Sequence, residues 1–159
     1  MKIYALLAAT AFVASPAIAQ VMSAPEYVAT AGASDLYERT SAQTVLETTA
    51  NPAIRSFATM MLRAHQQSTD MVKAAAMQAH VPVDPPMLTP TQDEMITELR
   101  SETGPARDAA YVAQQRAAHG QALTIQKAYA ASGTVAPLQV AAAKIVPIVQ
   151  MHIAMLMKM

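Results

Sequence analysis

Apolar residues recur along most of the chain at three- and four-residue intervals, the spacing of helices that bury one face. The clearest stretch runs from Pro52 to about Ala79. We predict a helix there, because a half-buried strand would instead alternate apolar and polar residues. The stripe that this helix would bury consists of Ile54, Phe57, Ala58, Met61, Leu62, His65, Val72 and Ala76.

Prolines and glycines lie where the helical pattern is interrupted. Proline fits the first turn of a helix but not its interior, and glycine often follows a helix end. The prolines of residues 80–86, HVPVDPP, therefore predict a loop. The predicted helices are a first from Ser23-Ala24-Pro25 to Ala50, a second from Pro52 to about Ala79, a short third from the capping residue Thr89 to about Ser101, a fourth from Gly104-Pro105 to Ser132-Gly133, and a last that starts between Thr134 and Pro137.

Four long helices and one short helix, joined by short links, are typical of an antiparallel four-helix bundle. The short helix would be inserted between the second and third long members. Pro147 lies inside the last helix, where it removes a backbone hydrogen bond, so we expect a kink about one turn before His152. The composition agrees, because alanine and methionine dominate and the chain has only 4 glycines. The predicted fold class is all-α.

The first residues have the features of a secretory signal peptide. Lys2 is a short positive region, residues 3–14 are apolar, and Ala17-Ile18-Ala19 is a cleavage signal. We predict that residues 1–19 are removed and that residues 20–159 form one helical domain. The chain has 0 cysteines, which excludes a lipid-anchored amino terminus and disulfides. We expect a free periplasmic protein, or one associated with the outer envelope.

Charge and motifs exclude several functions. The 11 basic and 11 acidic side chains supply no basic stripe for nucleic acid. After the leader, no segment reaches the roughly 20 unbroken apolar residues of a membrane helix. The paired Glu-x-x-His motifs of a di-iron centre, the C-x-x-C-H motif of covalent haem and a glycine-rich phosphate loop are absent from the sequence. Nothing in the sequence therefore requires an enzyme.

Histidines occur on the apolar side of three of the four long predicted helices. They are His65, His119 and His152, and the remaining long helix carries Glu38 on its stripe. One polar side chain from each helix could converge in a bundle core and bind one transition metal ion, namely Zn, Mn, Fe or Cu. Residues that would support these ligands are Asp35, Asp108, Tyr111 and Gln115.

Each of these features also has a structural interpretation. The same histidines could belong to a buried hydrogen-bond network, because buried polar groups must be paired. The chain has 12 methionines, and Met151, Met155 and Met159 beside His152 could offer thioethers to Cu(I). We favour core packing for the methionines, because Met155 and Met159 lie on the stripe expected to be buried.

Four short segments occur in order along the predicted mature chain. They are Ser34-Asp35-Leu36-Tyr37-Glu38, Asn51-Pro52-Ala53-Ile54-Arg55-Ser56-Phe57-Ala58-Thr59-Met60-Met61 followed by His65, Asp108-Ala109-Ala110-Tyr111 with Gln115 and His119, and Pro147 with His152. As a set they resemble the exported bacterial family called domain of unknown function 4142.

The resemblance implies a ferritin-like four-helix bundle in the periplasm or outer envelope, with Glu38, His65, His119 and His152 at recurring polar positions. The family often has Asp immediately before the second-helix histidine, where this chain has Ala64. It also often has Phe before the Asp of the fourth helix, where this chain has Arg107. Ala64 removes one carboxylate that could have supported His65.

Three functions follow as hypotheses. The bundle could bind one metal ion for storage, buffering or sensing in the envelope. It could instead be a non-catalytic envelope or stress-related protein whose histidines form a buried polar network. As an enzyme, it would use a bound metal to consume peroxide, with Tyr111 as a nearby redox or proton-transfer group. The reaction, the oligomeric state, any protein partner and the role of residues 80–90 are not indicated by the sequence.

Overall fold

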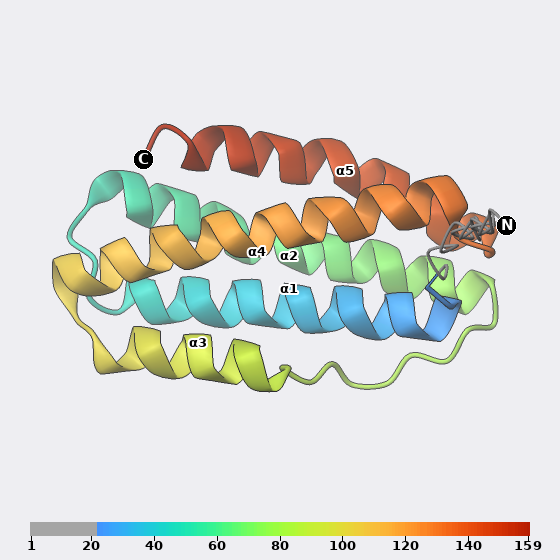
Figure 1. Ribbon diagram of the computed structural model, residues 1–159, viewed down its shortest axis with the longest axis horizontal. Helices are drawn as coiled ribbons and strands as arrows, with labels where there is room; N and C mark the ends of the chain where they lie inside the picture. The colour runs from blue at the N-terminus through green and yellow to red at the C-terminus, as the bar shows by residue number, and fades with distance from the viewer. Residues whose placement is uncertain (1–21) are drawn as a thin grey trace, which may run out of the picture.

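The computed structural model describes residues 22–159, in which every regular element is a helix (Figure 1). The predicted signal peptide lies outside the described residues. The all-α bundle predicted from the sequence is confirmed, with four long helices and one short helix. They are α1 (Ala24–Leu46), α2 (Pro52–Gln78), α3 (Pro90–Ser101), α4 (Gly104–Ser132) and α5 (Ala136–Leu156).

The end of α1 differs from the prediction, because the helix ends at Leu46 rather than at Ala50. The threonine at position 49 explains the difference. Its hydroxyl donates a hydrogen bond to Asp108 at 3.0 Å and accepts one from the backbone of Asn51 at 3.2 Å. A short hydroxyl side chain that bonds to neighbouring groups competes with the helix for the backbone, so the chain turns here.

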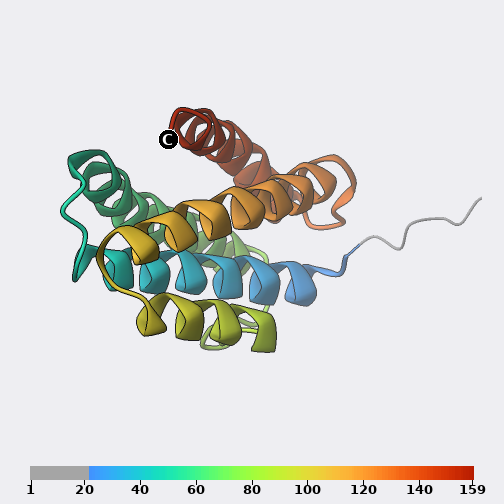
Figure 2. The same ribbon diagram turned by 60° about the vertical axis from the view of Figure 1, so that its left-hand side comes forward.

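The four long helices form two antiparallel hairpins. In each pair, α1 with α2 and α4 with α5, the helices pack along their lengths, and the pairs meet where α2 contacts α5 and α1 contacts α4. The short helix α3 lies outside this bundle against α1 and α4, as Figures 1 and 2 show. Each long helix therefore presents one face to a common interior.

Side-chain caps fix where three helices begin. Ser23 and Glu26 form a reciprocal capping box at α1, and Thr89 and Gln92 form one at α3. The side chain of Asn51 accepts hydrogen bonds from two backbone amides at the start of α2. Each cap is worth about 1 kcal/mol, because it satisfies amides that have no partner within the helix.

The core consists of two apolar clusters separated along the bundle axis. One contains Tyr27 and Tyr129, whose rings stack with centroids 3.9 Å apart. The other contains Phe57, Met61 and Tyr111. Along each long helix, the chain passes from one cluster to the other through a short polar segment. Seven of the buried polar side chains thus form a layer between the clusters, listed by helix as Asp35 and Glu38, His65 and Thr69, Gln115 and His119, and His152.

Helix α5 is the one helix among residues 22–159 that is long and apolar enough, by length and composition alone, to cross a membrane. It has 21 residues. In this structure it buries Leu138, Ile145 and Leu156 against the bundle. Pro147 lies within this helix without ending it. The absence of a membrane span stays a prediction.

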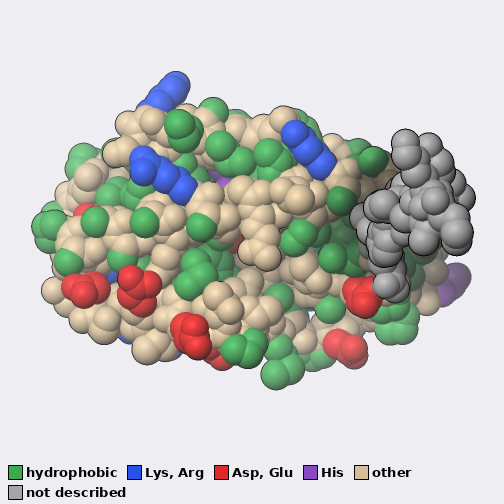
Figure 3. Space-filling model, viewed as in Figure 1, with side chains coloured by type: hydrophobic (Ala, Val, Ile, Leu, Met, Phe, Trp, Pro, Cys, Tyr) green, Lys and Arg blue, Asp and Glu red, His purple; other side chains and the backbone are tan. Residues whose placement is uncertain are grey.

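The outer surface has no single dominant charge on the face drawn in Figure 3. Acidic side chains on that face lie in its lower half, over α3 and also over the region of α1 and the loop that precedes α3, and basic ones lie over the region of α4 and α5. The acidic residues of α3 are Asp93, Glu94 and Glu98. This arrangement agrees with the neutral overall charge of the sequence.

The loop of residues 79–89 begins with a helix stop that uses an unusual residue. The backbone amide of Val81 donates to the carbonyl of Ala76, and that of His80 donates to Met77, as in a Schellman motif. His80 therefore has a positive φ of 54°. This conformation costs a residue with a Cβ roughly 1–2 kcal/mol and costs glycine almost nothing.

Replacing His80 with glycine should stabilise the protein by about 1 kcal/mol, because it removes this backbone strain. Urea unfolding monitored by circular dichroism measures the change. Ala79→Gly is the matched control, since Ala79 has an ordinary φ of −96° and should lose stability on the same substitution. Equal effects at the two positions would show that the strain at His80 contributes nothing.

Candidate metal centre

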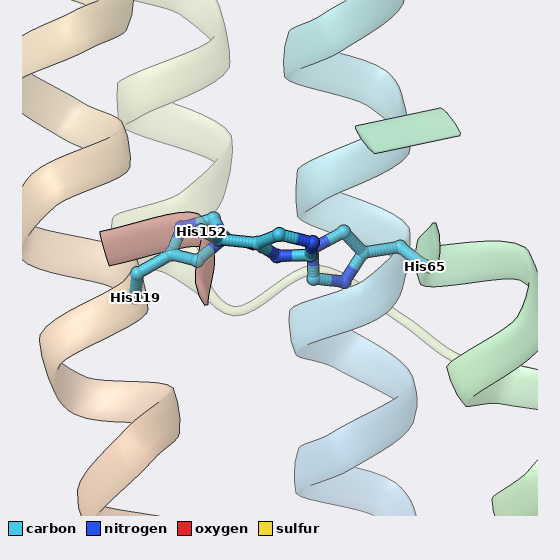
Figure 4. Close-up of side chains that lie close together, drawn as sticks. All are labelled: His65, His119 and His152. Atoms are coloured by element: carbon cyan, nitrogen blue, oxygen red, sulfur yellow. Dashed lines mark hydrogen bonds between the residues drawn. The ribbon is translucent and has the colours of Figure 1, made fainter. Parts of the chain in front are cut away.

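Three histidines from three helices meet in the polar layer (Figure 4). His65 comes from α2, His119 from α4 and His152 from α5. Each histidine offers one ring nitrogen to a group in which these atoms lie within 4.8 Å of one another. The residues are 6%, 0% and 1% exposed. Helical spacing left open whether the three side chains lie at one height along the bundle, and in the structure they do.

The three rings crowd around one point rather than stacking. Their centroids are 5.6 Å apart for His65 and His119, 5.7 Å for His65 and His152, and 5.3 Å for His119 and His152. The shortest contact joins His119 Nε2 to His152 Nδ1 at 3.3 Å. Two nitrogens that share one zinc ion at about 2.1 Å in tetrahedral geometry would be about 3.4 Å apart. The spacing suits either a shared ion or a weak hydrogen bond.

Backbone and carboxylate groups orient two of the rings. His65 Nδ1 lies 2.8 Å from Asp35 Oδ1, and Thr69 donates to Asp35 Oδ2 at 3.0 Å. His119 Nδ1 lies 3.0 Å from the backbone oxygen of Gln115. An Nδ1–H that donates to such an acceptor leaves the Nε2 lone pair free for a metal, the arrangement common around metal-binding histidines.

Asp35 supplies a carboxylate to His65 from α1, whereas the residue before His65 is the small Ala64. Thr69, one turn after His65 on the same face, was not singled out from the sequence. Its position four residues from a buried histidine was the available signal, because residues four apart share a helix face.

Glu38 lies beside the histidines but is not one of the converging group. It is 1% exposed, and Oε1 is 3.4 Å from His119 Nδ1. Neither carboxylate oxygen has a hydrogen-bond partner among residues 22–159. Burial raises the pKa of Glu38 to about 7, although the nearby His65 acts in the opposite direction. An unpaired buried carboxylate is costly, so this side chain needs either a proton or a cation.

Three further residues were expected to support the ligands, and they lie in different surroundings: Asp108, Tyr111 and Gln115. Gln115 holds His119 through its backbone oxygen, and its side-chain amide donates to Ser41 at 3.1 Å. The hydroxyl of Tyr111 is buried without a partner in the described chain, and burial raises its pKa well above the usual value. Asp108 is bonded to Thr49 at the end of the bundle, about 16 Å along α4 from His119. At that distance along one helix, Asp108 does not contact His119.

The methionines beside His152 do not converge with it. Met151 is 50% exposed and Met159 is 40% exposed, whereas His152 is 1% exposed. The expectation that Met159 lies in the buried stripe was wrong, because α5 ends at Leu156 and Met159 follows it. Met155 is only partly buried against the core. A combined thioether and imidazole site is not formed.

The histidines differ in how their surroundings affect protonation. Burial, with the charge of His65 and His152, lowers the pKa of His119 to about 3. Burial and the charge of His65 lower the pKa of His152 to about 4. Burial also acts to lower the pKa of His65, but the bond to Asp35 and the charge of Glu38 raise it overall. Because its pKa is raised rather than lowered, His65 holds a proton more readily than His119 and His152 do.

Acid should destabilise the metal-free protein in two stages. His119 and His152 gain protons near pH 6.5 when unfolded but only near pH 3 and 4 when folded. Between its folded and unfolded pKa values, each of these histidines lowers the unfolding free energy by about 1.4 kcal/mol for every pH unit of acidification. Glu38 acts in the opposite direction and cancels the effect of one histidine, because it binds its proton near pH 7 when folded and near pH 4.5 when unfolded. The contribution of His65, whose pKa is raised, is already complete below pH 6.5.

The unfolding free energy should thus fall by about 1.4 kcal/mol per pH unit from pH 6.5 to 4.5, and about twice as steeply just below pH 4.5. Urea unfolding in the presence of a chelator measures this dependence. Glu38→Gln should make the first stage steeper, because it removes the opposing group. Unchanged stability down to about pH 4 would contradict the buried, neutral state of His119 and His152.

Comparison with known proteins agrees with the fold. A crystal structure of a protein of domain of unknown function 305 from Streptomyces coelicolor, described as secreted, matches with a TM-score of 0.65 and 17% sequence identity, and covers 86% of this chain and 90% of that chain. No curated protein matches the sequence significantly. The sequence model of one family, described as a domain of unknown function (DUF4142), matches residues 7–159. The chain therefore belongs to the DUF4142 family.

Proposed function

We propose that this protein binds one transition metal ion in the centre of its helical bundle, through His65, His119 and His152 with Glu38 beside them. The observation that supports this most strongly is the gathering of three buried ring nitrogens within 4.8 Å of one another. A chance arrangement of core histidines would need no common point for their nitrogens.

Unpaired polar atoms in and beside the histidine cluster support a cation. His65 Nε2, His152 Nε2 and both oxygens of Glu38 have no hydrogen-bond partner in the described part of the chain. Leaving a buried polar atom unpaired costs about 1–3 kcal/mol, and more if it is charged. A metal ion would accept nitrogen lone pairs and neutralise the carboxylate at the same time.

The donor types narrow the choice of metal. Imidazole and carboxylate suit Zn, Fe, Mn and Cu(II), whereas Cu(I) prefers thiolate and thioether ligands. The chain has no cysteine, and Met151 and Met159 face solvent. We therefore assign the site to a divalent transition metal ion rather than to Cu(I).

Burial of the ligands favours retention of the ion over rapid transfer. All three histidines are at most 6% exposed, so an ion can leave only when helices separate locally. Storage or buffering fits such slow exchange. The amino-terminal leader pattern, together with a structurally similar protein described as secreted, supports export to the envelope as the compartment.

The alternative is a buried polar network without metal. In that arrangement His152 Nδ1 donates its proton to His119 Nε2 across the 3.3 Å contact, and Glu38 stays protonated. The two arrangements differ in one respect that can be measured directly, which is whether a metal ion occupies the centre.

Elemental analysis of the untagged protein purified from the periplasm should find about one transition metal ion per chain. The double variant His65→Ala/His119→Ala should lose it, because two of three converging nitrogens are gone. His80→Ala is the matched control and should keep the metal, since His80 is exposed on a loop. Metal absent from wild type, and not taken up by the chelator-treated protein when Zn, Fe, Mn or Cu is added, would favour the polar network.

Glu38→Gln should stabilise the metal-free protein and weaken its binding of the metal ion. Without metal, the variant should be more stable above pH 7 by on the order of 1 kcal/mol, because an unpaired buried charge has been removed. With metal, its affinity should fall about 10- to 100-fold, as for other carboxylates that support a metal site. Urea unfolding with chelator and competition with a chromophoric chelator measure the two effects. A variant that binds metal as tightly as wild type would exclude Glu38 from the site.

A further inference from the structure

We propose that the metal centre keeps one open position, which faces a small cavity and takes a single exogenous ligand of one to three atoms, such as water, hydroxide or azide. This rests on the proposed metal site and adds the class of ligand that the site admits.

The cavity borders the histidines and has a volume of about 20 Å³. A volume of about 10–15 Å³ on this kind of measure is enough for one water molecule. His65 and His152 both contribute to its wall, and these are the two histidines whose Nε2 atoms have no partner in the described chain. The remaining lining residues are Ala31, Ser34, Asp35, Ala64, Ser68, Ala122, Gln126, Ile145, Ile148 and Val149.

Apart from Ala64, the residue before His65, the lining residues lie level with the histidines or on one side of them. On α2 and α4 they include Ser68 and Ala122, about one turn after the histidine, and on α5 they include Ile148, one turn before His152. On α1 they include Ser34, one turn before Glu38. Because neighbouring helices run in opposite directions, these positions all point toward the end of the bundle that holds the start of α1 (Figure 1).

Side chains of the cluster that contains Phe57 lie on the opposite side of the layer. Phe57 lies with its ring centroid 6.4 Å from those of His119 and His152. Tyr111, which shares a cluster with Phe57, and Gln115, one turn before His119, occupy the same side. Glu38 contacts His119 at Nδ1, the ring atom that faces Gln115. A small ligand can therefore reach the ion only from the cavity side.

The walls set the size and polarity of the ligand. Small residues, such as Ala64 and Ala122, create the space, and isoleucine and valine side chains of α5 close it. The hydroxyls of Ser34 and Ser68 can bond the far end of a ligand. A ring of five non-hydrogen atoms, such as free imidazole, is too large for this volume.

The test uses protein loaded with Co²⁺, whose visible absorption reports the number and kind of its ligands. Azide should change the spectrum with saturation at one azide per metal, and free imidazole should not. Ala122→Leu should fill the cavity and weaken azide binding at least tenfold while the Co²⁺ content stays at one per chain. Ala118→Leu adds the same volume one residue before His119, outside the cavity lining, and should leave azide binding unchanged.

The outcomes separate this inference from the proposed function. Protein that binds one Co²⁺ but shows no response to azide would overturn the open position and leave the metal site intact. Equal azide affinity in Ala122→Leu and wild type would also overturn it, because the ligand would then enter elsewhere. Protein that binds none of Co²⁺, Zn²⁺, Fe²⁺, Mn²⁺ and Cu²⁺ would overturn both.

Discussion

The hydrogen bond between Asp35 and His65 is the interaction on which the centre of the bundle depends. It joins α1 to α2 across the interior at 2.8 Å, with both side chains buried. Thr69 donates to the second oxygen of the same carboxylate. Without these two donors the Asp35 carboxylate would be a buried unpaired charge, and without Asp35 the His65 ring could rotate freely about its side chain. The pair therefore keeps the Asp35 carboxylate hydrogen-bonded and holds the His65 ring in one orientation at the site.

The polar layer costs stability that the apolar clusters on either side must offset. Stacked tyrosines occupy one cluster, and Phe57 with Met61 and Tyr111 occupies the other. Burial of each large apolar side chain contributes about 1.5–3 kcal/mol. The bundle can thus tolerate several unpaired polar atoms in the middle, which a smaller core could not. Each long helix contributes polar side chains at the same height, and burying them lowers the stability of the bundle. Function is the usual reason for such a layer to persist.

Much of the fold could be predicted from the sequence, because its determinants are local. Proline in the first turn marks where α2 begins, and Thr89 with Gln92 marks α3. Each histidine could be placed on a buried face by helical phase. Distances between helices could not be predicted in this way, because phase does not give the height of a residue along the bundle. That is why the closeness of His119 to His152 was left open. Asp108 is a different case, because it lies on the same helix as His119, and their separation of about three turns follows from the sequence alone.

Side-chain pairing was the second feature beyond the reach of sequence patterns. Asp35 and Glu38 lie one turn apart on α1, and the sequence favoured Glu38 as the residue beside the histidines. In the structure Asp35 orients His65 with good geometry, and Glu38 is left without a hydrogen-bond partner among the described residues. The difference has a physical origin, because only Asp35 meets both a ring nitrogen and the hydroxyl of Thr69. Glu38 is thereby left without a partner, so the charge of its carboxylate depends on whether a cation occupies the centre. Asp35 thus sets the orientation of a histidine ring, and Glu38 makes the charge of the site depend on the presence of a cation.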